Sequence, residues 1–127
     1  MKIDEIYKPF DYSQYGVYVI KTDITAAGVF KIEDTLPLHI KQIRGIYFTC
    51  NSRSAERVIG YISLNFNEGI LKNVLLPVIN NNTIRHNGHA IPLNETVKSN
   101  SIVQGYFYNR VATKRPFTVK IYLHYEK

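Results

Sequence analysis

The side chains that could carry chemistry in this sequence are few and widely spaced. His86 and His89 flank an Asn-Gly dipeptide, so their rings could meet on one side of a tight turn. Two imidazoles make an incomplete metal site, and no third histidine or carboxylate follows at a spacing typical of transition-metal sites. The remaining histidines, His39 and His124, stand alone in expected strands. We therefore predict no metal site and no cofactor.

The arrangements that activate a nucleophile or a general base are also missing. The chain has ten carboxylates, and none forms a pair inside an apolar strand where burial would raise a pKa. Cys50 is the single cysteine, and we expect a small buried residue near a strand end rather than a reactive thiol. No nucleophile elbow and no glycine-rich phosphate loop occurs. We predict that the protein is not an enzyme.

Aromatic and basic residues are the more informative group. The chain has ten Tyr, six Phe, no Trp and a net charge of +6. In the stretch 101–127, tyrosines alternate with Lys and Arg, a mixture typical of surfaces that stack bases and contact phosphates. Tyrosine is equally typical of protein interfaces, where it gives a large contact area at low entropic cost. Sugar-binding surfaces favour Trp, so we rank a protein interface first, nucleic acid second and carbohydrate third.

The candidate residues form two sets. The interface candidates are aromatic, or lie beside aromatic residues on an expected outer surface: Tyr7, Phe10, Tyr12, Tyr106, Tyr108, Tyr122 and Lys120. The candidates for contact with nucleic acid or another acidic partner are basic residues in expected loops: Arg53, Arg57, Arg110, Lys114 and Arg115. Because these basic residues are scattered, a solvated basic surface is the simpler interpretation of the second set.

The elements that position these residues are expected to be strands. Ile and Tyr are abundant and favour strands, whereas Ala, the best helix former, is scarce. Expected strands cover 15–24, 29–32, 38–50 with a bulge at the glycine in position 45, 60–66, 70–79, 83–86 joined to 89–93 through the Asn-Gly turn, 102–109 and 117–125. We expect the last two strands to form a hairpin through 110–116.

Side-chain alternation assigns two faces to the last expected strand. Val119, Ile121, Leu123 and Tyr125 would face the core, and Thr118, Lys120, Tyr122 and His124 would form a polar and aromatic outer surface. About eight strands near ten residues apart, with no amphipathic helix, predict an all-β antiparallel sandwich, and long loops suit a jelly roll. An immunoglobulin-like sandwich is the alternative, but its Cys and Trp hallmark is absent.

We expect one β-sandwich domain over 15–127, preceded by an extended N-terminal arm over 1–14 whose aromatic residues dock on another surface. The N-terminal sequence lacks an apolar signal core, and no apolar run has the length of a membrane span. These features predict a soluble protein made in the cytoplasm.

The chain resembles the single jelly-roll proteins of virus and bacteriophage particles. The resemblance lies in the strand count, the arm before the first strand, the stretch LNETVKSNSIVQGYFYN and the closing PFTVKIYLHYEK, over about residues 15–125. Jelly rolls share no residue signature, so the resemblance assigns no functional residue. It implies a structural role in the virion, as a capsid, decoration, fibre-base or spike-base protein in symmetric oligomers.

These considerations predict a structural virion component that acts through protein–protein assembly. Its partners would be other copies of itself, other virion proteins and packaged nucleic acid. Two alternatives remain: a single-stranded nucleic-acid-binding β-barrel module in the cytoplasm, and a carbohydrate- or peptide-binding β-sandwich.

Overall fold

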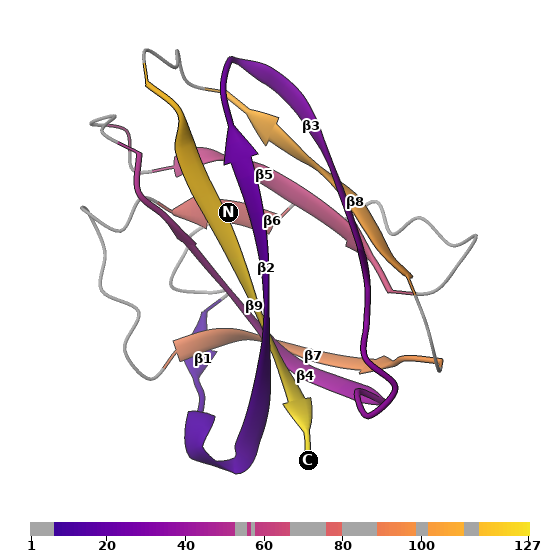
Figure 1. The fold of residues 1–127 in the computed structure, drawn as a ribbon. Helices are drawn as coiled ribbons and strands as arrows, with labels where there is room; N and C mark the ends of the chain where they lie inside the picture. The colour runs from indigo at the N-terminus through magenta and orange to yellow at the C-terminus, as the bar shows by residue number, and fades with distance from the viewer. Residues whose placement is uncertain are drawn as a thin grey trace.

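The chain folds into two antiparallel sheets (Figure 1). The computed structural model describes residues 7–52, 56, 58–66, 76–79, 89–98, 102–110 and 115–127. In chain order the elements are β1 (Lys8–Pro9), the 3-10 turn η1 (Tyr12–Gln14), β2 (Tyr15–Ile24), β3 (Gly28–Thr35), β4 (Gln42–Cys50), β5 (Val58–Asn65), β6 (Leu76–Ile79), β7 (His89–Thr96), β8 (Ile102–Asn109) and β9 (Phe117–Glu126). The predicted all-β class is confirmed. None of these elements is a helix long and apolar enough to cross a membrane.

The order of strands in the two sheets defines the fold. The first sheet has the order β1-β7-β4-β9-β2, and the second sheet has the order β3-β8-β5-β6. Leaving β1 aside, the strands pair from the outside inward, β2 with β9, β3 with β8, β4 with β7 and β5 with β6. This order results when one long hairpin with four ladders is rolled up. Successive ladders of the hairpin then lie in alternate sheets. It is the double-sheet arrangement of a jelly roll.

The predicted hairpin between the last two strands is wrong. β8 lies in the second sheet between β3 and β5, and β9 lies in the first sheet between β2 and β4. Sheets in a sandwich pack about 10 Å apart, and the connection 110–116 is long enough to cross between them. Each strand therefore gains two ladders in the middle of a sheet, instead of one ladder with its neighbour in sequence.

The core lies between the sheets and is built by alternation along the central strands. Val103 and Phe107 of β8 face inward from the second sheet, and Ile121 and Leu123 of β9 face inward from the first. All four are fully buried, and they join one continuous apolar cluster. The inward face predicted for β9 is thus confirmed, and burial of these side chains is the main stabilising contribution to the sandwich.

Several predicted boundaries match the structure. The strands expected over 15–24 and 102–109 agree with β2 and β8, and the bulge expected at Gly45 appears as a register shift between Ile43 and Gly45. The expected strand over 38–50 begins later, at Gln42. The Asn-Gly turn with its strand 83–86, and the first part of the strand expected over 70–79, lie outside the described residues.

The N-terminal segment packs on the sandwich from Tyr7 onward. β1 pairs with β7, with Lys8 opposite Ala90, and the Tyr12 hydroxyl donates a hydrogen bond to the His89 carbonyl. Asp11 begins η1 by accepting a hydrogen bond from the Ser13 amide at 3.1 Å. The described part of the expected N-terminal arm, residues 7–14, therefore adds a short edge strand and a turn to the first sheet.

Candidate interaction surfaces

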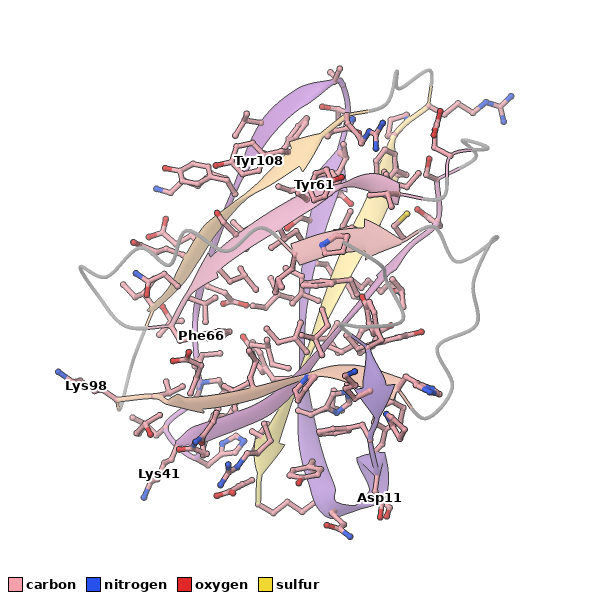
Figure 2. The ribbon with its side chains drawn as sticks, turned by 180° about the vertical axis from the view of Figure 1, so that it is seen from behind. Asp11, Lys41, Tyr61, Phe66, Lys98 and Tyr108 are labelled. Atoms are coloured by element: carbon pink, nitrogen blue, oxygen red, sulfur yellow. The ribbon has the colours of Figure 1, made fainter. Side chains whose placement is uncertain are left out.

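The outer side of the second sheet carries three tyrosines, which we call the second-sheet tyrosine face. Tyr106 and Tyr108 of β8 are 39% and 38% exposed, and their ring centroids lie 6.4 Å apart. Tyr61 of β5 is the cross-strand partner of Tyr108. Figure 2 shows Tyr61 and Tyr108 beside one another on neighbouring strands. Their side chains form an aromatic surface across the middle of this sheet.

Local sequence explains how these rings come to face outward. Phe107 lies between Tyr106 and Tyr108 and is fully buried, so alternation along β8 turns both tyrosines toward solvent. Gly105 lets β5 approach closely, because a Cβ at this position would lie 1.9 Å from the Ser63 carbonyl oxygen. The second-sheet tyrosine face is thus held by a rigid pair of central strands.

Across β3, this face is bordered by an apolar side chain and an ion pair, and Arg110 is exposed just beyond the end of β8. Val29 of the edge strand β3 lies opposite Tyr108 and is 60% exposed. Lys31, opposite Tyr106, forms an ion pair with Glu33 at 3.3 Å. This ion pair, with a hydrogen bond from Gln104, lowers the pKa of the Glu33 carboxyl. A surface of this kind is suited to covering by another protein, whereas a nucleic-acid strand would need unpaired cations along its track.

The outer side of the first sheet carries a second group, the first-sheet aromatic face, formed by Phe10, Tyr12, Tyr47, Tyr122 and His124. Tyr47 of β4 and Tyr122 of β9 are cross-strand partners with ring centroids 5.5 Å apart. Tyr12 lies 6.4 Å from Tyr47 and stacks on His124 at 4.7 Å with an angle of 8° between the rings. Burial raises the pKa of the phenols of Tyr12 and Tyr47. The N-terminal segment therefore covers one end of this face.

His124 is buried by this covering. Phe10 contacts its ring at a centroid distance of 5.2 Å, and Phe10 occupies the space over Gly45, where a Cβ would lie 2.8 Å from the Phe10 ring. His124 is only 7% exposed, and its Nε2 has no hydrogen-bond partner among the described residues. Burial lowers the pKa of this imidazole. Its outward direction was predicted correctly, but the packing of Phe10 and Tyr12 over it was not.

Next to the first-sheet aromatic face lie two lysines of adjacent strands. Lys21 of β2 is the cross-strand partner of Lys120 of β9, one row beyond Val19 and Tyr122. Within the described part of the chain neither lysine forms an ion pair. Like charges directly opposite one another on a sheet are destabilising. This position therefore favours an acidic group from a partner.

The structure separates the predicted interface candidates into three places. Tyr106 and Tyr108 lie together on the second-sheet tyrosine face. Phe10, Tyr12, Tyr122 and Lys120 lie on the outer side of the first sheet. Tyr7 was expected at an interface, but it is 5% exposed and belongs to the core cluster. Burial there raises the pKa of its phenol. Its ring is covered within its own domain and is not presented to a neighbouring subunit.

The structure describes only two of the five basic candidates. Arg110 and Arg115 are exposed beyond the end of β8 and before the start of β9. Arg53, Arg57 and Lys114 lie outside the described residues. Because β8 and β9 belong to different sheets, Tyr106 and Tyr122 lie on opposite outer faces. The base-stacking surface considered for these residues is therefore divided between two sides of the molecule.

Sequence reasoning did not select Tyr47, Tyr61 or Lys21 as interface candidates. Alternation along GYISLNF placed Tyr61 opposite the core-facing side chains, and this signal was available in the sequence. Tyr47 and Lys21 gain their significance only from their cross-strand partners, Tyr122 and Lys120, which the sequence does not give.

The described part of the chain can also be compared with the arrangements that metal ligands and reactive thiols adopt. No three His, Cys, Asp or Glu side chains of these residues lie together as metal ligands would. Cys50, the last residue of β4, is buried, and burial raises the pKa of its thiol. This agrees with the predicted packing role for Cys50.

No known protein family and no curated protein matches the sequence. Solved structures with a similar chain include the one described as the acidic stable capsid structure of Helicobacter pylori bacteriophage KHP30. That chain has a TM-score of 0.48 and 16% sequence identity, with 87% of this chain and 89% of that chain covered. Another is Salmonella Typhimurium PliG, a periplasmic lysozyme inhibitor of g-type lysozyme, with a TM-score of 0.36, 10% identity and coverages of 90% and 94%. At these scores neither likeness assigns a family or a function.

Proposed function

We propose that this protein is a structural component of a virus or bacteriophage particle and that it works through protein–protein assembly. The roles that fit are capsid, decoration, and fibre-base or spike-base protein, located in the virion after synthesis in the host cytoplasm. Jelly rolls occur in viral capsid domains, lectins and cupins, so the fold alone leaves several functions open. The surface of the sandwich is what favours assembly among them.

The observation that carries the proposal is the exposed pair Tyr106 and Tyr108 on β8, with Val29 of β3 beside them, on the outer side of the second sheet. Large apolar and aromatic side chains gathered on one surface mark sites that another protein covers. Tyrosine is enriched in such sites because it supplies contact area at low entropic cost. The neutralisation of Lys31 by Glu33 beside these tyrosines favours a protein partner over nucleic acid.

The opposite face adds a second contact. The first-sheet aromatic face ends in Tyr47 and Tyr122, and Val19 lies in the same row. Two different surfaces on opposite sides of one sandwich allow a copy to contact two neighbours by heterologous contacts. Contacts of this type close into rings or continue into extended arrays, and both are the architectures of virion shells and bases.

Analytical ultracentrifugation at low and high salt tests the proposal. An assembly held by aromatic surfaces should form oligomers that persist at high salt, because apolar contacts are not screened. A nucleic-acid-binding module would instead remain monomeric and bind a fluorescent oligonucleotide with an affinity that falls steeply with salt. A monomer at every protein concentration that binds oligonucleotide in this way would refute the assembly role.

A further inference from the structure

The four edges of the two sheets are not equivalent. β1, at one edge of the first sheet, has two residues and contains Pro9, and β6, at one edge of the second, has four residues and contains Pro77. Short edge strands and proline prevent the addition of a further strand. The other edges are β2 and β3, with ten and eight residues and no proline. Among the described residues, one flank of the sandwich is therefore blocked and the other is open to a further strand.

Of the two open edge strands, β2 is the one whose lysine has no ion pair within the described residues. The Lys31 charge on β3 is neutralised by Glu33 of the same strand. On β2, Lys21 faces Lys120, and these two lysines have no ion pair within the described residues. Two positions along β2, Asp23 is exposed on the same side of the sheet. Each β2 edge thus carries a lysine without an ion pair and, two positions further along the same side of the strand, a carboxylate.

We propose that β2 binds β2 of a second copy of this chain, antiparallel and around a twofold axis at Thr22. The two five-stranded first sheets would then form one continuous sheet across the dimer. This register joins residues 20–24 of the two β2 strands, and a partner strand would replace water on the outward-directed backbone N–H and C=O groups of this stretch. The proposal deepens the assembly role and rests on it for the expectation that the chain forms oligomers.

Charge complementarity selects the second copy as that strand. In the register centred on Thr22, Lys21 lies opposite Asp23 of the partner subunit, and the same pair occurs a second time through the twofold axis. Asp23 is held in place within its own chain, since its Oδ1 accepts a hydrogen bond from the Thr118 hydroxyl at 2.9 Å. The partner's Asp23 would bring a negative charge directly opposite Lys21, where the cross-strand partner within the single chain is the like-charged Lys120.

The other side-chain pairs of this register are also compatible. Thr22 would face Thr22 of the partner subunit, and a threonine pair is a favourable cross-strand contact. Ile20 would face Ile24 of the partner subunit, and both are core residues at 4% and 0% exposure. The apolar interiors of the two sandwiches would therefore meet at the seam, below the charged row.

The test uses two charge-reversal variants of the full chain, K21D and D23K. Each places like charges opposite one another twice in its own homodimer, so we expect each to dimerise at least tenfold more weakly than the wild type in sedimentation equilibrium. An equimolar mixture should recover dimerisation as a heterodimer, because Asp at position 21 of one chain then faces Lys at position 23 of the other. K41D, at an exposed position before β4 and outside both aromatic faces, is the matched control and should dimerise like the wild type.

Circular dichroism and thermal unfolding of each variant show whether it is folded before mixing. The proposal is overturned if the wild type does not dimerise, or if the mixture of two folded variants dimerises no better than each alone. It is also overturned if K41D weakens dimerisation as much as K21D. Loss of larger oligomers on substitution of Tyr106 and Tyr108, with the dimer retained, separates the tyrosine contact from this edge contact.

Discussion

Removing the two exposed rings of the second-sheet tyrosine face should weaken assembly and leave folding intact. The perturbation is the double variant Tyr106→Ser with Tyr108→Ser. The rings are 39% and 38% exposed, and an aromatic side chain offers roughly 200 Å² in all, so a partner could cover about 80 Å² of each. At about 25 cal/mol per Å², covering one ring contributes about 2 kcal/mol. The upper limit for the pair is therefore about 4 kcal/mol.

Serine retains part of the covered surface, so the loss should be smaller than this limit. A loss of about 3 kcal/mol corresponds to a roughly 100-fold higher dissociation constant, because about 1.4 kcal/mol is a factor of ten. Sedimentation velocity over a protein concentration series measures this change. Thermal unfolding of the same samples, at concentrations where both proteins are dissociated, should show nearly equal stability, since neither ring belongs to the core.

Phe107→Ala is the matched control, because Phe107 lies between the two tyrosines and points the opposite way. It is fully buried and packs edge-on against Phe117 at a centroid distance of 6.5 Å. Its truncation should lower the free energy of unfolding by about 3–5 kcal/mol. If the double tyrosine variant lost as much stability as Phe107→Ala while its assembly was unchanged, the assignment of these tyrosines to an interface would be wrong.

Two further outcomes follow from the first sheet. The buried His124 imidazole has a lowered pKa, so the unfolded chain takes up a proton first as the pH falls below about 6.5. The free energy of unfolding should therefore decrease from pH 7 toward pH 5, by at most about 1.4 kcal/mol per pH unit for this group. Urea unfolding measures this pH dependence, which should disappear in His124→Gln and persist in His39→Gln. On β9, Leu123→Ala should cost about 2–5 kcal/mol of stability, whereas Tyr122→Ser should cost less and act mainly on assembly. Equal losses in chemical denaturation would contradict the two faces assigned to this strand.

Local alternation along single strands was predictable from the sequence. The stretch 101–109 shows which residues of β8 share a face, because successive side chains of a strand point to opposite sides. For this reason the core-facing residues Val119, Ile121 and Leu123 of β9 were predicted correctly. The same reasoning gave the strand Tyr15–Ile24 and the bulge at Gly45, since β-branched and aromatic residues and a glycine are local signals.

Pairing between distant strands was not predictable in this way. The expected hairpin of β8 and β9 followed from their adjacency in sequence, whereas the fold places them in different sheets. The position of Tyr7 in the core and of His124 under Phe10 likewise depends on where the N-terminal segment crosses β4 and β9. Such contacts join residues that are far apart in the chain, and no local period reports them.

The sequence by itself determined the strand content, the core-facing side of the last strand and the excess of tyrosine and positive charge. Only the tertiary structure decided which strands lie at the open edges and which side chains become cross-strand partners, including Lys21 with Lys120 and Tyr47 with Tyr122. The physical reason is that a strand's period fixes the direction of its side chains, whereas its neighbours are selected by the packing of the whole sandwich.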